Sequence, residues 1–260
     1  MWELFDQLST ARGRRIRVAI VDSGVEEDHP WVGGRLASSF VVVGDERRGY
    51  SVVEGAASDG FGHGTAAAGQ IRRFSPDAEL ISVRVLGGDL RTNSQSLLTA
   101  LRWLTTQDLH VVNLSLSTMR ADLALRMSHS VDDLYARNIA CVCARGYHLT
   151  GKAYPTNFSG TIGVSFKNLP QAQLQFRPLD PVAFDAAGIG LTVAWKGGAT
   201  RTVEGSSYAC PLVTGLAARF LELRPTLTPY ELKSLLKEYA HRQANGWWEP
   251  WMDAVDLPPT

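Results

Sequence analysis

Apolar, β-branched runs alternate with helix-period stretches along this chain, and that alternation constrains the fold more than any other feature of the sequence. Apolar runs without polar interruption indicate strands buried on both faces, as in a parallel sheet covered by helices. The predicted strands are residues 16–21, 80–85, 111–116, 139–144 and 161–165. The predicted helices are residues 64–73, 94–106, 121–137, 208–224 and 228–239, with a small hairpin within residues 181–203. The sequence therefore predicts an α/β fold.

The size and charge balance of the chain limit its organisation and its partners. With 260 residues, 45% of them hydrophobic, the chain can build one large core, so we expect a single domain over residues 1–260. Lys and Arg total 26, as do Asp and Glu, which leaves no basic excess for nucleic acid or anionic lipid. The N-terminal segment lacks the apolar run of a secretory signal, and no later stretch is apolar enough to span a membrane. We therefore expect a soluble, cytoplasmic protein with no nucleic-acid or membrane partner.

The cysteines and the C-terminal tryptophans are expected in the core. Cys141 and Cys143 lie two apart in an apolar run, and the odd total of three cysteines argues against a disulfide framework. Because no second CxxC or HxxxH spacing accompanies them, buried free thiols are expected rather than a metal site. The indoles of Trp247, Trp248 and Trp251 are expected to cover the sheet, whereas an exposed cluster would indicate a partner site.

Three motifs supply the residue types that nucleophilic catalysis requires. Asp22 ends an apolar strand and precedes a glycine turn, at the strand end where α/β proteins place their sites. His63 stands between two glycines at the start of a small-residue helix, and Ser207 opens an apolar helix whose positive end stabilises negative charge on an attacked carbonyl oxygen. Taken singly, these residues can be interpreted as a turn aspartate, a structural histidine and a serine N-cap. Together they provide a hydroxyl, a base and a carboxylate that orients the base.

The order and spacing of these motifs resemble those of the subtilisin-like serine proteases, the subtilases. The resemblance rests on residues 18–24 (VAIVDSG), 62–65 (GHGT) and 205–211 (GSSYACP), extends to residues 112–116 and 154–164, and covers nearly the whole chain. It implies a three-layer fold with a mostly parallel, seven-stranded sheet flanked by helices. It also implies a serine endopeptidase without a cofactor, which cleaves extended peptides through an acyl-enzyme on Ser207, with His63 as the base and Asp22 holding its tautomer.

The resemblance implies two segments that hold the substrate. The first would pair with the substrate backbone as an added strand, and the second would form the far wall of the primary specificity pocket. Arg145 stands where the family carries a small apolar residue, so acidic or polar side chains are expected at the cleavage site if its guanidinium faces the pocket. If it points to solvent, it indicates no preference. The first segment is Ser115, Leu116 and Ser117, and the second is Ala144, Arg145 and Gly146.

One catalytic donor of the family is missing from this sequence. Tyr147 replaces the asparagine of the oxyanion hole, a loss worth roughly a hundred- to a thousandfold in turnover in subtilisin. The candidate replacements are Tyr147, His148 and Asn157, and the backbone N–H of Ser207 remains.

Two further departures concern segments outside the motifs. Residues 72–77 form a connection too short for the calcium loop that family members carry, so no metal site is expected. The first strand begins so early that the family's inhibitory prodomain has no room. The protein is therefore expected to fold without a prodomain, or the sequence is a trimmed part of a longer one.

Other functions remain open at this point. A catalytically impaired subtilase fold that only binds peptides is favoured by the altered residue 147, and a macrocyclase-type transpeptidase would use an amine in place of water at the acyl-enzyme. A nucleotide-binding domain is excluded because no GxGxxG or GxxxxGK[ST] motif follows any predicted strand.

Overall fold

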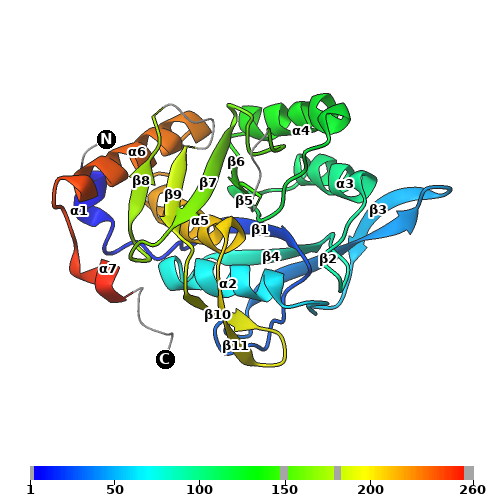
Figure 1. Ribbon diagram of the computed structural model, residues 1–260, viewed down its shortest axis with the longest axis horizontal. Coiled ribbons are helices and arrows are strands. Elements are labelled where there is room, and N and C mark those ends of the chain that lie inside the picture. The colour runs from blue at the N-terminus through cyan, green and yellow to red at the C-terminus, as the bar shows by residue number, and fades with distance from the viewer. Residues whose placement is uncertain (1–2, 147–151, 179–182, 255–260) are drawn as a thin grey trace.

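The elements of the protein are arranged around one large twisted sheet (Figure 1). The computed structural model describes residues 3–146, 152–178 and 183–254. The strands are β1 (Arg17–Asp22), β2 (Leu36–Asp45), β3 (Gly49–Glu54), β4 (Glu79–Arg84), β5 (Val111–Leu114), β6 (Ala140–Ala144), β7 (Thr161–Lys167), β8 (Leu174–Phe176), β9 (Phe184–Ala187), β10 (Leu191–Trp195) and β11 (Ala199–Val203). The helices are α1 (Leu4–Gln7), α2 (His63–Phe74), α3 (Ser94–Leu104), the 3-10 helix η1 (Ala121–Leu123), α4 (Ala124–Ala136), α5 (Ser206–Leu223), α6 (Pro229–Ala244) and α7 (Pro250–Ala254).

The sheet confirms the predicted α/β class. Its strand order is β3-β2-β4-β1-β5-β6-β7-β9-β8, and the seven strands from β2 to β9 in that order run parallel. One antiparallel strand is added at each edge, β3 beside β2 and β8 beside β9, which brings the sheet to nine strands. The seven expected strands therefore correspond to the parallel part of the sheet.

Strand β1 is buried on both faces, which is why its sequence is apolar without interruption. Val18 and Ile20 belong to the cluster that α2 and α5 cover, whereas Ala19 and Val21 belong to the cluster under α3 and α4. Full burial of each large apolar side chain contributes about 1.5–3 kcal/mol, so both helical layers hold this strand in place. Residue 22, at the end of β1, is thereby held on a rigid element.

The position of β1 in the sheet explains where a site can form. β1 lies between β4 and β5, and from it the chain first builds the half of the sheet with β2 to β4 and then the half that begins with β5. Such a reversal of strand order leaves a crevice outside the carboxyl ends of the strands. Asp22 is the last residue of β1 and so lies at that crevice.

The predicted strands and helices are present, with ends that differ by a few residues. Helix α6 begins with the predicted capping box, in which Thr228 Oγ1 accepts from Glu231 N at 3.2 Å and Thr228 N donates to Glu231 Oε2 at 2.8 Å. Strands β10 and β11 form the expected hairpin around residues 196–198. The sequence analysis missed the β2–β3 hairpin, although residues 40–43 (FVVV) form an apolar run, and both strands are half-buried or exposed.

The cysteines are confirmed as buried free thiols, and the tryptophans divide into two kinds. Trp247 and Trp251 pack against the core, where the Trp247 ring lies 5.5 Å from Tyr239. Trp248 is 38% exposed and donates to Asp253 at 2.7 Å, so the expectation that it covers the sheet is wrong. Within the described ranges, every helix is too short or too polar to cross a bilayer.

Candidate active site

The carboxylate of Asp22 and the imidazole of His63 meet in the crevice at the end of β1. His63 Nδ1 lies 2.8 Å from Asp22 Oδ1 and 2.9 Å from Oδ2, and Ser23 N donates to Oδ1 at 2.7 Å. Asp22 is fully buried and His63 is 7% exposed. The structure therefore brings together two of the three residues that the sequence predicts as a triad, although they are separated by 41 positions.

Glycines beside His63 allow this close approach. Gly62 has a φ of +117°, in the left-handed region that favours glycine, and the residue after it starts α2. A Cβ atom on Gly64 would lie 1.9 Å from the carbonyl oxygen of Gly24 and 3.1 Å from Asp22 Cβ. The start of the helix can therefore touch the turn after β1 only without side chains at this position.

Asp59 holds the loop that carries His63, a role that the sequence analysis did not assign. Its Oδ1 accepts from Ser23 Oγ at 2.7 Å and from the amides of Phe61 and Gly62 at 2.9 and 2.7 Å. Its Oδ2 accepts from Thr65 N at 2.8 Å. One carboxylate thus ties the turn after Asp22 to the first turn of α2. The signal in the sequence was an aspartate at the head of a glycine-rich turn, which is typical of side chains that bond nearby amides.

The charges around His63 favour its protonated form. Burial alone would lower the pKa of the imidazole, but the charge and hydrogen bond of Asp22, with a smaller contribution from Asp59, outweigh burial and raise the pKa above the ordinary value of 6.5. A base with a raised pKa is a stronger proton acceptor than free imidazole. This is the electrostatic arrangement that a general base paired with a carboxylate requires.

Ser207 lies in the first turn of α5, close to the same crevice. Its hydroxyl donates to the carbonyl oxygen of Ser115 at 3.0 Å. The ring of Tyr208, the next residue, lies 5.2 Å from the His63 ring, so the segment that carries Ser207 reaches the imidazole. The third predicted residue is therefore a neighbour of the Asp22–His63 pair, with its hydroxyl bonded to the end of β5.

Tyr208 also belongs to the site, because its ring packs on His63. Burial and the negative charge of Asp22 raise the pKa of its phenol, the charge of Arg201 lowers it, and the result is about 12. The hydroxyl is therefore neutral at physiological pH. Its ring shields one side of His63 from solvent.

A buried polar network below Ser207 was also missed. Asn113 Oδ1 accepts from Thr214 Oγ1 at 2.9 Å, and Asn113 Nδ2 donates to Ser115 Oγ at 2.9 Å. Asn113 and Thr214 are fully buried and Ser115 is 3% exposed. The network joins α5, which carries Ser207, to the residue whose carbonyl accepts the Ser207 hydroxyl. Buried networks of this kind fix side chains when every member is satisfied.

The two predicted substrate segments lie side by side. The backbone N–H of Gly146 donates to Ser117 Oγ at 3.1 Å, and Arg145 N donates to Val164 O at 2.8 Å in continuation of the sheet. Ser206 Oγ donates to the Arg145 carbonyl. Residues 115–117 and 144–146 therefore contact each other, and each segment is bonded to the start of α5, through Ser115 and Arg145. Arg145 is half-buried.

Of the three candidate donors for the oxyanion, the structure describes one. Tyr147 and His148 lie outside the described residues. Asn157 accepts from Ala153 N through its amide oxygen at 2.7 Å, which leaves its NH2 group as the donor, so its oxyanion role stays a prediction. The N–H of Ser207 lies in the first turn of α5, where amides have no acceptor within the helix.

A cavity of about 340 Å³ adjoins the predicted substrate strand. It is lined by residues 116–118, by residues 90–92 and by apolar side chains of α3, η1 and α4. Its lining residues are Leu86, Leu90, Arg91, Thr92, Ser94, Leu97, Leu116, Ser117, Thr118, Leu123 and Met127. The cavity is large enough to receive an apolar side chain.

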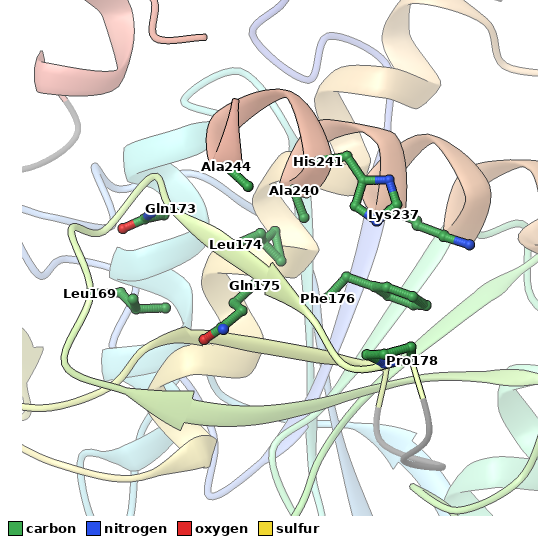
Figure 2. Close-up of a pocket in the computed structure, with 10 residues that line it drawn as sticks. All are labelled: Leu169, Gln173, Leu174, Gln175, Phe176, Pro178, Lys237, Ala240, His241 and Ala244. Atoms are coloured by element: carbon green, nitrogen blue, oxygen red, sulfur yellow. The ribbon is translucent and has the colours of Figure 1, made fainter. Parts of the chain in front are cut away.

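A second cavity, of about 630 Å³, lies between α6 and the edge strand β8 (Figure 2). Lys237 Nζ lies 4.7 Å from the centre of the Phe176 ring, and the His241 ring lies 5.7 Å from it. Four strands separate β8 from β1 in the sheet, and none of the predicted site residues lines this cavity. In the described part of the chain, no group of three or more His, Cys, Asp or Glu residues could hold a metal ion.

A carboxylate–imidazole pair beside a helix-borne serine, at the carboxyl ends of a parallel sheet, is the arrangement of a serine-type hydrolase. The sequence profile of the subtilase family matches residues 13–249. The chain belongs to the subtilase family, whose members are serine-type endopeptidases with an Asp-His-Ser triad.

Known subtilisins are similar to most of the chain. Subtilisin BL of Lederbergia lenta is 28% identical over 242 residues, which cover 88% of this chain and 84% of that protein. Subtilisin amylosacchariticus of Bacillus subtilis subsp. amylosacchariticus is 27% identical over 251 residues, which cover 91% of this chain and 63% of that protein. The chain is thus a serine-type endopeptidase by family, and its substrates are peptides or proteins.

Solved structures confirm the fold. The crystal structure of a cold adapted subtilisin-like serine proteinase superposes with a TM-score of 0.71 at 22% identity, over 88% of this chain and 83% of that one. Sphericase superposes with a TM-score of 0.72 at 23% identity, over 87% and 83% of the two chains. The comparisons lend no support to the impaired binding module or to the macrocyclase.

Proposed function

We propose that the protein hydrolyses peptide bonds with Ser207 as the nucleophile, His63 as the general base and Asp22 as the residue that orients His63. The observation that carries the proposal is the buried contact of 2.8 Å between His63 Nδ1 and Asp22 Oδ1, made beside the helix turn that bears Ser207. Because the carboxylate accepts the proton on Nδ1, the lone pair of Nε2 is available to take a proton from Ser207.

The reaction begins when the Ser207 hydroxyl turns from the Ser115 carbonyl to Nε2 of His63. Oγ attacks the carbonyl carbon of the substrate while its proton passes to His63. The C–N bond then breaks as His63 returns that proton to the leaving amine, which leaves an ester on Ser207. Water, activated by the same imidazole, releases the acid and restores the serine.

The substrate would be an extended peptide that adds as a strand along Ser115, Leu116 and Ser117. Once Ser207 has turned away, the Ser115 carbonyl is free to accept an N–H from the substrate backbone. Ala144, Arg145 and Gly146 would form the far wall of the pocket for the side chain before the scissile bond. The hydrogen bond between Gly146 N and Ser117 Oγ favours small side chains there, because it links the two walls.

The cavity beside residues 116–118, with its leucine and methionine side chains, supports a second element of specificity. A side chain that lies further from the scissile bond along the same strand would enter this cavity and contact Leu97 and Leu123, which line it. Burial of one such side chain contributes about 1.5–3 kcal/mol to substrate binding. The enzyme would therefore prefer an apolar residue upstream of the bond that it cleaves.

The oxyanion that forms during attack would accept one hydrogen bond from the N–H of Ser207 and one from a second donor. Asn157 is the described candidate, through its NH2 group, and Tyr147 and His148 stay predictions. Asn157→Ala should lower kcat with little change in KM if Asn157 is that donor, because the bond forms only in the transition state.

The remaining expectations concern the setting of the enzyme. We propose one peptidase domain over residues 1–260, because the described elements pack on one sheet. We also propose a cytoplasmic location with no nucleic-acid or membrane partner, which is supported by three free thiols and a net charge of zero.

Labelling with a fluorophosphonate tests the nucleophile. Intact-mass analysis should show one adduct on the wild-type protein, mapped to Ser207, and none on Ser207→Ala or His63→Ala. Ser234→Ala is the matched control, because the Ser234 hydroxyl bonds the Tyr230 carbonyl in an exposed helix turn. Labelled protein should also lose cleavage of a casein substrate. A folded wild-type protein that takes no label at Ser207 would refute the assigned role of this residue.

A further inference from the structure

A cationic surface lies beside the proposed triad on the β10–β11 hairpin. We name it the hairpin face and define it by Trp195, Lys196 and Arg201. The Arg201 guanidinium lies 4.7 Å from the centre of the Trp195 ring, and Lys196 Nζ donates to the Gly60 carbonyl at 3.2 Å. Lys196 and Arg201 are both exposed, and among the described residues neither forms an ion pair with a carboxylate. Two positive charges are thus held in place without a carboxylate paired to either of them in the described part of the chain.

The hairpin face is joined directly to the loop that carries His63. The Trp195 ring fills the space over Gly62, where a Cβ atom would come within 2.7 Å of the indole, and it lies 5.5 Å from the Phe61 ring. Residues 61 and 62 immediately precede His63. The indole on which the Arg201 guanidinium stacks therefore packs against the residues that precede the start of α2.

Tyr208 connects the same face to the proposed triad. Its ring packs on His63 at 5.2 Å, and its hydroxyl is within electrostatic range of both Asp22 and Arg201, which shift its pKa in opposite directions. The charge of Arg201 therefore acts close to the place where the scissile bond would lie. The carboxylate of Glu26 is held at the hairpin turn, where it accepts from the amides of Gly197 and Gly198 at 2.6 and 3.0 Å, and among the described residues it forms no ion pair with Lys196 or Arg201.

The proposed mechanism assigns this face to one half of the substrate. The acyl half runs along residues 115–117, which border Gly146. The amine half must lie toward His63, because His63 delivers the proton to the leaving nitrogen. Because Trp195 packs on the His63 loop, residues that follow the scissile bond would pass close to Trp195 and Arg201.

We infer that the hairpin face selects substrates with an acidic side chain among the first few residues after the scissile bond, with Arg201 as the main determinant. The inference rests on the proposed endopeptidase function. A guanidinium stacked on an indole keeps its N–H edge free to bind a carboxylate in two places, and the stacking restricts its rotamers. Lys196 adds a second positive charge to the same path.

Peptide pairs that differ only by Glu or Gln after the scissile bond test this inference. We expect the wild-type enzyme to cleave the Glu peptide about two- to fivefold more efficiently, in kcat/KM, as for one exposed ion pair. The preference should shrink in 0.5 M NaCl, since exposed charges are screened. In Arg201→Gln the ratio should fall toward one. Arg47→Gln, the same change at the exposed turn between β2 and β3, should leave the ratio and the activity unaltered.

A binding measurement separates this inference from the proposed function. The same peptides are titrated into Ser207→Ala and into Ser207→Ala with Arg201→Gln, with indole fluorescence as the signal. Tighter binding of the Glu peptide that depends on Arg201 supports the inference even if no peptide is cleaved, and absence of cleavage would count against the endopeptidase function alone. Equal affinity for both peptides, or equal cleavage of both by the wild-type enzyme, would overturn the inference.

Discussion

Replacement of Asp22 by asparagine should abolish most of the activity by reversing the tautomer of His63. In the structure, Asp22 Oδ1 accepts from Ser23 N at 2.7 Å, so the amide oxygen of an asparagine would keep that position. That oxygen, 2.8 Å from His63 Nδ1, would remain bonded to Ser23 N, and the NH2 group would take the place of Oδ2, 2.9 Å from Nδ1, where it can donate to that nitrogen. An N–H that donates to Nδ1 leaves the ring proton on Nε2. His63 would therefore have no lone pair to receive the proton of Ser207.

The expected loss is large because the base itself is disabled. The equivalent change in a serine protease with the same triad lowers kcat about 10⁴-fold, which corresponds to about 5.4 kcal/mol of transition-state stabilisation. KM should change much less, since Asp22 is fully buried and has no proposed contact with the substrate.

The assay is kcat/KM on a fluorogenic peptide, together with the rate of fluorophosphonate labelling and a thermal melt. Asp45→Asn is the control, because Asp45 also accepts backbone N–H bonds, from Arg47 and Arg48 at 2.8 Å each, but lies in an exposed turn. It should retain wild-type activity. If Asp22→Asn melts as a folded protein and keeps more than a tenth of the wild-type kcat/KM, the tautomer argument is wrong.

Three further predictions concern pH, the buried network and metal ions. Although burial alone lowers the pKa of His63, Asp22 and Asp59 raise this pKa above 6.5. As the pH decreases and the base becomes protonated, kcat/KM should therefore fall through an inflection above pH 6.5. An inflection below pH 6.5 would contradict this. Thr214→Val removes the 2.9 Å hydrogen bond to Asn113, so it should lower the free energy of unfolding by about 1–3 kcal/mol and reduce kcat more than it raises KM. Thr214→Ser keeps the hydroxyl and should have the stability and the kcat of the wild-type protein. A valine variant as stable as the wild-type protein would show that the bond is unimportant. Because no described cluster of side chains fits a metal ion, EDTA should leave the melting temperature and activity unchanged, and a fall in the melting temperature that Ca²⁺ reverses would reveal a site.

Local features of the sequence determined the elements and the residues that carry the chemistry. The uninterrupted apolar run before Asp22 indicated a strand buried on both faces, and the structure has that strand in the middle of a parallel sheet. The glycines around His63 and the cap at Thr228 indicated helix starts where α2 and α6 begin. Patterns of this kind are readable because burial, backbone conformation and capping depend on residues within a few positions of one another.

Tertiary structure alone decided which distant residues meet. The sequence contained no sign that Asp59 would also bond Ser23, or that Asn113 would join Ser115 to Thr214. These contacts depend on the strand order around β1 and on the packing of α5 against β5, which periodicity does not specify.

The same reason explains the elements that were missed. Strand β3 forms the sheet edge and β2 lies beside it, and both combine polar with apolar residues because they are half-buried or exposed. The packing of Tyr208 on His63 arises because the starts of α5 and α2 converge on the crevice at the end of β1. A linear sequence records what each residue can do, whereas the fold decides which partner it has, because the contacts that form a site join segments whose separation along the chain carries no local signal.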